Sequence, residues 1–94
     1  MSKLSPSEIR RIQNATNKAG VDLSVVGSRV NPNKPLHVNS DYDYVIDANN
    51  KVRSDLRSSL PGAKSVQEGL PSRQDIFKGT VDPTRPYATF HPEP

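Results

Sequence analysis

The 94-residue chain contains no cysteine, and this absence narrows the chemistry that is open to it. Without cysteine there is no disulfide framework and no thiolate metal site. A metal ion would have to be held by oxygen ligands or by one of the 2 histidines. The chain also lacks an apolar run long enough to span a bilayer, and its first residues lack the apolar segment of a signal peptide. We therefore expect a soluble segment with no membrane partner.

Apolar residues are scarce as well. They make up 32% of the chain, there are 9 prolines, and the mean hydropathy is -0.72. A chain of this length forms one domain, residues 1–94, and buries only about two-thirds of the surface that its unfolded form exposes. The formal charge of +3 and the pI near 9.5 suit an anionic nucleotide or RNA, but they are equally typical of ordinary surface charge.

The sequence predicts an α/β or α+β domain in which a small mixed sheet is flanked by helices. A first helix begins after the capping residue Ser5, and Gly20 ends it. Residues 21–26 form a strand, residues 50–60 a second helix, and the segment near Phe90 a last strand. The apolar side of the first helix consists of Ile9, Ile12, Ala15 and Ala19.

Residues 41–48 alternate strictly and predict another strand. Tyr42 and Tyr44 point to one face, while Asp41 and Asp43 point to the other. Two carboxylates at this spacing lie within reach of one cation. Mg²⁺ (or Mn²⁺) is the natural candidate, because it prefers hard oxygen ligands and is commonly shared between carboxylates and substrate phosphates.

The segment that ends the preceding strand suits a phosphate. Gly27 lets the backbone approach a group that any Cβ would obstruct, and Ser28 adds a hydroxyl donor. A short helix or nest after Gly27 would direct further N–H groups at the ligand. Arg29 is expected to add positive charge to the same pocket.

These residues follow one another in a recognisable order: an apolar pair, then Gly27 and Ser28, and then Asp41 and Asp43 on the next strand. This order resembles the defining motif of the polymerase-beta-like nucleotidyltransferases. The resemblance implies a nucleotidyltransferase-like fold. It also implies that Ser28 contacts a nucleoside triphosphate and that Asp41 and Asp43 bind the divalent metal. That family usually has a third acidic residue on a later strand, for which Asp75 is the candidate; the alternative for Asp75 is a helix cap or a turn.

A second resemblance covers most of the chain from Val21 onward. The order of its fragments is similar to C-terminal toxin modules of bacterial polymorphic toxins. This resemblance implies a module of a larger secreted protein that acts in the cytoplasm of a target cell, a cognate immunity protein, and an RNA acceptor such as a tRNA. The fragments are Gly-Ser-Arg, Ser-Asp-Tyr-Asp-Tyr-Val-Ile, Ser-Leu-Pro-Gly, Asp-Ile-Phe-Lys-Gly, Asp-Pro-Thr-Arg-Pro-Tyr and Phe-His-Pro.

Other interpretations stay open at this point. The acidic strand would also fit a solvent-facing edge strand whose charges prevent aggregation. A catalytically inactive binding module and a metal-dependent RNase toxin are the alternatives in function. His37 and His91 are expected at the surface without a partner. Tyr87 and Phe90 are expected in the core rather than stacked on a base.

Overall fold

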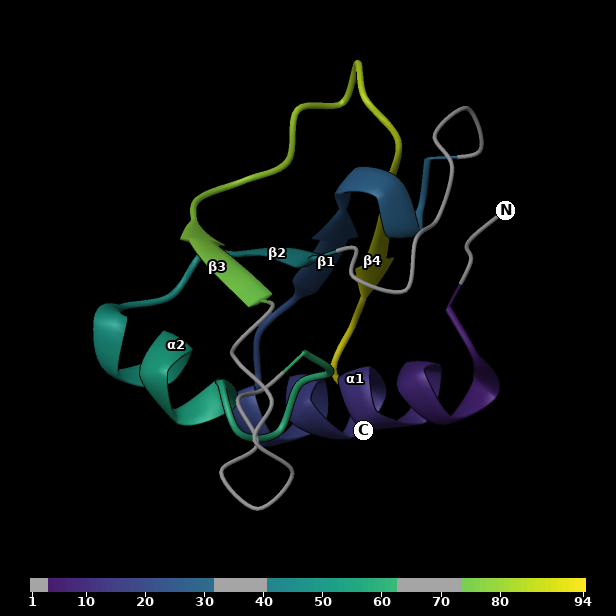
Figure 1. Ribbon diagram of the computed structural model, residues 1–94. Helices are drawn as coiled ribbons and strands as arrows, with labels where there is room; N and C mark the ends of the chain where they lie inside the picture. Colours follow the sequence, from purple (N-terminus) through teal and green to yellow (C-terminus); the bar gives the residue numbers. More distant parts are fainter. Residues whose placement is uncertain (1–3, 32–40, 63–73) are drawn as a thin grey trace.

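A computed structural model describes residues 4–31, 41–62 and 74–94. Its elements follow one another along the chain and are labelled in Figure 1. They are α1 (Pro6–Ala19), β1 (Leu23–Val26), the short 3₁₀ helix η1 (Gly27–Arg29), β2 (Tyr42–Ile46), α2 (Asn50–Leu56), β3 (Gln74–Lys78) and β4 (Tyr87–Phe90). These helices and strands confirm the predicted small mixed α+β fold. Residues 64–66, whose sequence is typical of a short strand, lie outside the described residues.

The four strands form one sheet in the order β3-β2-β1-β4. β2 and β3 run parallel, whereas β1 is antiparallel to both β2 and β4. The acidic strand β2 is therefore paired on both sides. The edge-strand interpretation was wrong, because a central strand has no free backbone edge for its charges to protect.

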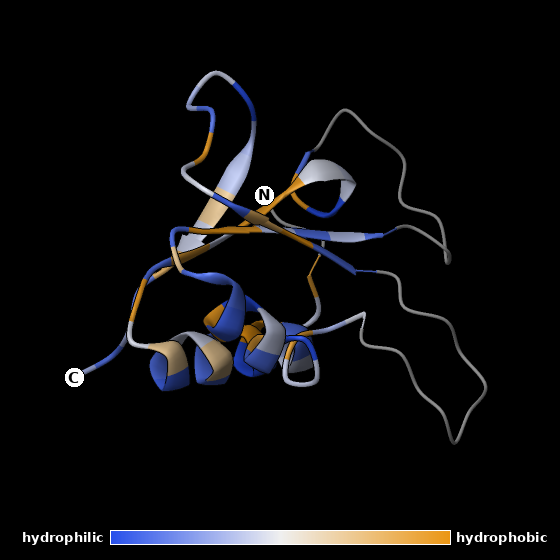
Figure 2. Cartoon of the chain, turned by 90° about the vertical axis from the view of Figure 1, so that its left-hand side faces the viewer, coloured by the Kyte–Doolittle hydropathy of each residue, from blue (hydrophilic) through white to orange (hydrophobic). Residues whose placement is uncertain are grey.

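Both helices cover the same face of the sheet, and η1 and residues 79–86 lie on the opposite side (Figures 1 and 2). Along β2 the buried residues are Tyr42, Tyr44 and Ile46, which pack into the core beneath the helices. Asp43 and Val45 are partly buried and point to the other face. This confirms the predicted alternation and leaves one face of the sheet open for a site.

The start of α1 is joined directly to β2. Ser5 and Glu8 form a capping box, with the Glu8 side chain accepting from the Ser5 N–H at 2.8 Å and the Ser5 hydroxyl accepting from the Glu8 N–H at 3.2 Å. The Tyr42 hydroxyl also donates to Glu8. Burial raises the pKa of the Glu8 carboxyl, but the hydrogen bonds from Ser5 and Tyr42 outweigh it and the pKa ends below its usual value.

α2 is shorter than the predicted helix at 50–60, because regular helix ends at Leu56 and the chain continues as turns. Leu60 is nevertheless fully buried, so that Leu56 and Leu60 both reach the core. Pro61 follows, and the residue before a proline disfavours helical backbone. The buried Tyr44 hydroxyl donates to the Pro61 carbonyl at 2.8 Å, which anchors this turn to the centre of β2.

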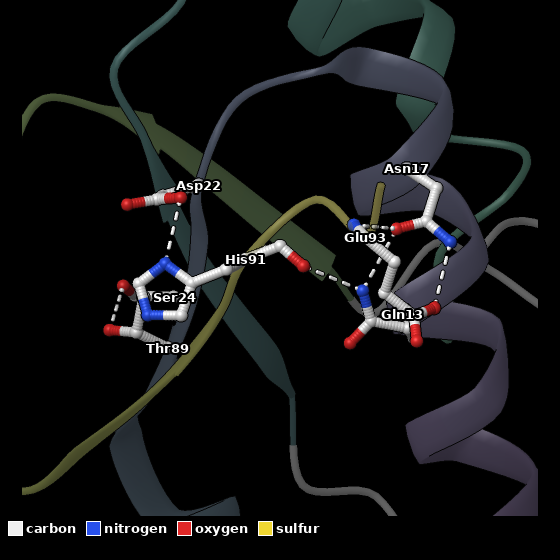
Figure 3. A network of polar contacts seen from close by, with 7 residues as sticks. All are labelled: Gln13, Asn17, Asp22, Ser24, Thr89, His91 and Glu93. Carbon is white, nitrogen blue, oxygen red and sulfur yellow. Dashed lines mark hydrogen bonds and ion pairs between the residues drawn. The ribbon is translucent and has the colours of Figure 1, made fainter.

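The end of the chain is tied to α1 by a network of polar contacts (Figure 3). The Gln13 amide donates to the His91 carbonyl at 2.8 Å. Asn17 accepts from the Glu93 N–H at 2.9 Å and donates to the Glu93 carboxylate at 3.0 Å. These contacts join two segments that lie at opposite ends of the sequence.

Two expectations for this region were wrong. His91 has a partner, since its Nδ1 lies 2.9 Å from the carboxylate of Asp22, although both side chains are largely exposed. Tyr87 is not a core residue, because 45% of it is exposed on the open face of the sheet. Phe90, by contrast, packs against the core as expected. No helix among the described residues is long and apolar enough to cross a membrane.

Candidate functional site

The candidate site lies where β1 ends and both β2 and β3 begin. The antiparallel register places Val26 opposite Asp43, so that the chain turns at Gly27 directly beside the start of β2. The parallel register of β2 and β3 then places Asp75 beside Asp43. Paired residues of neighbouring strands point to the same face. The glycine turn and two of the three predicted carboxylates therefore meet at one end of the open face.

Gly27 is required here for a reason that the sequence did not reveal. Its φ is +83°, a conformation that side chains rarely adopt. A Cβ at this position would lie 2.6 Å from the Oδ2 atom of Asp43, which is too close for two non-bonded atoms. The glycine thus makes room for the Asp43 carboxylate, and the two halves of the motif lie directly beside each other.

Asp75 lies within β3, which contradicts the alternative of a helix cap or turn. It is paired with Asp43, and paired strands typically lie about 4.8 Å apart. Two like charges directly opposite each other destabilise a sheet. The parallel register therefore brings two carboxylate-bearing residues side by side on the open face.

Asp41 lies one residue before β2 and is exposed. It keeps the parity of Asp43, so that its backbone position suits the same face. Among residues 4–31, 41–62 and 74–94 there is no group of three or more acidic or histidine side chains close enough to hold one metal ion. The pairing of Asp41 with Asp43 around a cation therefore stays a prediction.

The expected short helix after Gly27 is present as η1, in which the N–H groups of Val30 and Asn31 both donate to the Gly27 carbonyl at 3.1 Å. Ser28 is partly buried at its centre. Arg29 turns elsewhere: it is 7% exposed, and its guanidinium carbon lies 3.8 Å from the centre of the Tyr42 ring. This cation–π contact directs Arg29 toward β2, and it is not among the residues that line the pocket below.

A pocket of about 710 Å³ opens over this end of the sheet. Its floor comes from three strands and its far wall from the connection between β3 and β4, which rises above the sheet in Figure 1. The lining residues are Val26, Gly27, Asn31, Asp43, Val45, Phe77, Thr80, Val81, Asp82, Arg85 and Pro86.

The wall is shaped by a turn at residues 82–86, a segment whose residue types favour turns. The Asp82 carboxylate accepts from the Thr84 N–H at 3.0 Å and from the Thr84 hydroxyl at 2.6 Å, and it lies 3.7 Å from the Arg85 Nε. The hydrogen bonds from Thr84 hold the pKa of Asp82 below its usual value. The turn therefore carries a carboxylate and an exposed guanidinium to the rim of the pocket.

No family model, curated protein or solved structure matches the chain. The case for a function therefore depends on the residues of the site and on the motif that they form.

Sequence reasoning missed Phe77 and Arg85. Phe77 has the parity of Asp75 within β3, so recognising a strand at residues 74–78 would have placed both on one face. Arg85 gave no local signal, because its position depends on how the connection between β3 and β4 folds back over the sheet. Chemically, the pocket combines a carboxylate end at Asp43, an apolar floor, and the paired Asp82 carboxylate and Arg85 guanidinium at its rim.

Proposed function

We propose that this domain is a metal-dependent nucleotidyltransferase that moves a nucleotidyl group from a nucleoside triphosphate to a hydroxyl acceptor. The observation that carries the proposal is the direct contact of the glycine turn with the acidic strand: Gly27 has no room for a Cβ beside the Asp43 carboxylate. A coincidental Gly-Ser and a coincidental Asp-x-Asp would have no reason to meet in space.

In the proposed reaction the acceptor hydroxyl attacks the α-phosphorus of the triphosphate. A new P–O bond forms, the bond between the α-phosphorus and the bridging oxygen breaks, and pyrophosphate leaves with the electron pair. Asp75 accepts the proton of the attacking hydroxyl, and its exposure on the same side of the sheet as Asp43 supports this role.

The donor set suits a hard divalent cation, since Asp41 and Asp43 offer carboxylate oxygens and leave room for water and phosphate ligands. Mg²⁺ or Mn²⁺ bound there would offset the charge that develops on the phosphates. The Gly27 backbone and the Ser28 hydroxyl bind the triphosphate. Arg85, at the rim of the pocket, supplies positive charge for the same phosphates.

We also propose that the acceptor is an RNA such as a tRNA, and that the domain acts as a secreted toxin module in the cytoplasm of a target cell and is masked by an immunity protein. The support for these points is the order of sequence fragments from Val21 onward. An RNase toxin would use the same acidic pair, whereas an inactive binding module would carry out neither reaction, and the products distinguish the three.

The test is transfer of label from each α-labelled nucleoside triphosphate to total bacterial RNA in the presence of Mg²⁺. The double variant Asp41→Ala, Asp43→Ala is expected to lose transfer by at least about a hundredfold, because it removes both proposed metal ligands. Asp47→Asn is the matched control, since Asp47 is an exposed aspartate at the opposite end of β2. It should retain wild-type activity.

Each other outcome has a distinct meaning. Equal activity in wild type and the double variant would overturn the proposed role of the acidic pair. RNA fragments without incorporated label would indicate a nuclease. A folded wild-type protein that neither labels nor cleaves RNA would favour the inactive binding module.

A further inference from the structure

The open face of the sheet carries two exposed aromatic side chains, one on each side of the candidate site. Phe77 on β3 is 54% exposed, and Tyr87 on β4 is 45% exposed. Tyr87 is paired with Val26, whereas Phe77 is paired with Val45. Of these two aromatics, Phe77 lines the pocket and Tyr87 does not.

The position of Phe77 relative to the carboxylates is set by the register of β2 and β3. Asp43 pairs with Asp75, and two residues further along the same strands Val45 pairs with Phe77. Two residues of a strand span about 6.6 Å, and their side chains point to the same face. Phe77 therefore lies next to the acidic end of the pocket along the sheet, and no charged residue of β2 or β3 lies between them on this face.

The part of the pocket around Phe77 has an apolar floor, because Phe77 is paired with Val45 on the sheet. The wall from the connection between β3 and β4 adds the apolar Val81 and Pro86, together with the polar Thr80, Asp82 and Arg85. The volume of about 710 Å³ is within the range of small-molecule sites, which combine apolar walls with a few polar groups. One end of this pocket suits phosphates and metal, and the other suits a flat apolar group.

We propose that the apolar half of the pocket binds the nucleobase of the nucleoside triphosphate, with the base stacked on Phe77. This inference rests on the proposed function, because it takes the phosphates to lie at Gly27 and Asp43. Every nucleobase has a π face, and stacking on an aromatic side chain is a common way to bind it. Phe77 is therefore a binding residue for the base, and residues 80–86 enclose the base from the opposite side.

The test compares ligands that differ only in whether they carry a nucleoside. Dissociation constants are measured with Mg²⁺ for ATP, GTP, CTP, UTP and inorganic tripolyphosphate. For the nucleotide that wild type binds most tightly, Phe77→Ala is expected to raise the dissociation constant about tenfold. It should leave tripolyphosphate unchanged, because Phe77 contributes nothing to the phosphate end. Phe77→Tyr keeps the ring and should retain most of the affinity.

Tyr87→Ala is the matched control, because it removes an exposed aromatic from the same face outside the pocket lining. It should bind nucleotides as wild type does. More than half of Phe77 is exposed, so its truncation is expected to leave the domain folded, and thermal unfolding of each variant checks this.

The inference is overturned if Phe77→Ala leaves the affinity for nucleotides unchanged or lowers the affinity for tripolyphosphate equally. It is also overturned if only Tyr87→Ala lowers the affinity for nucleotides. A wild-type protein that binds none of the four triphosphates also overturns it. The proposed reaction fails separately. If the protein binds nucleotides through Phe77 but transfers no label, the base site is supported and the proposed reaction is refuted. If the protein transfers label and Phe77→Ala does not change the transfer, the reaction is supported and the base site is refuted.

Discussion

The contact between Gly27 and Asp43 is the smallest unit on which the site depends. The chain leaves β1 with a positive φ at Gly27, and the carboxylate of the neighbouring strand occupies the space where a side chain would otherwise lie. The backbone conformation and the carboxylate position are therefore coupled. A substitution at either residue should change the conformation of the other, even though 15 residues separate them in sequence.

We predict that Gly27→Ala displaces the Asp43 carboxylate and lowers nucleotidyl transfer at least about tenfold, since a 1 Å misplacement at a reacting centre has large effects. The positive φ should also lower the free energy of unfolding by about 1–2 kcal/mol. The ¹³C chemical shift of the Asp43 carboxyl carbon reports the displacement without relying on activity.

Gly20→Ala is the control for this prediction. Gly20 also has a positive φ, +72°, but a Cβ there would meet no atom within 4 Å. This variant should lose a similar amount of stability and leave both transfer and the Asp43 signal unchanged. Equal effects of the two substitutions on the Asp43 signal would show that the contact does not matter.

At the scale of elements, the site is supported from beneath by the junction of α1 and β2. Glu8 caps α1 and accepts from the Tyr42 hydroxyl, and the Arg29 guanidinium stacks on the ring of the same tyrosine. Tyr42 directly precedes Asp43. One aromatic side chain thus links the first helix, η1 and the acidic strand.

We predict that Glu8→Gln lowers the free energy of unfolding at pH 7 by about 0.5–1 kcal/mol, because it removes the charge near the helix N-terminus and weakens the bond from Tyr42. The folded-state pKa of Glu8 lies below its ordinary value of 4.5. The ionised carboxylate therefore contributes stability above pH 4.5, and this contribution is lost as the pH falls through the lower folded-state pKa.

Denaturant unfolding between pH 7 and pH 3 measures this effect, and the gap between wild type and Glu8→Gln should shrink on acidification. Ser5→Ala removes the reciprocal capping bond but keeps the carboxylate. It should be less stable than wild type at pH 7 and still lose stability in acid. A constant gap between wild type and Glu8→Gln across this range would contradict the role given to the charge.

At the scale of the whole molecule, the sheet order β3-β2-β1-β4 sets β4 beside β1, and the residues after β4 then reach α1. Gln13 and Asn17, one helical turn apart, hold this last segment through its backbone and through Glu93. These contacts join the first helix to the residues that follow β4.

We predict that Asn17→Ala lowers the free energy of unfolding by about 0.5–1 kcal/mol and speeds hydrogen exchange of the Glu93 amide, because Asn17 accepts from that N–H. Asn14→Ala is the matched control, since Asn14 is an exposed asparagine of the same helix. Both variants gain the same helix propensity, so their difference reports the contacts of the Asn17 side chain with Glu93 and with Gln13. Equal stability of the two variants would contradict the prediction.

The sequence by itself determined the features that depend on near neighbours. The cap at Ser5, the end of α1 at Gly20 and the turn at residues 82–86 follow from local backbone chemistry. The alternation of residues 41–48 decided which side chains of β2 are buried, because successive residues of a strand must point to opposite faces. The motif residues Gly27 and Asp43 were also visible locally.

Only the tertiary structure decided which strands are neighbours. Asp75 lies beside Asp43 because β3 pairs in parallel with β2, and no pattern within residues 74–78 specifies that partner. The exposure of Tyr87, the contact of His91 with Asp22 and the place of Arg85 at the pocket have the same origin. Such placements depend on contacts between residues far apart in the chain, whereas sequence periodicity reports only the local geometry of each element.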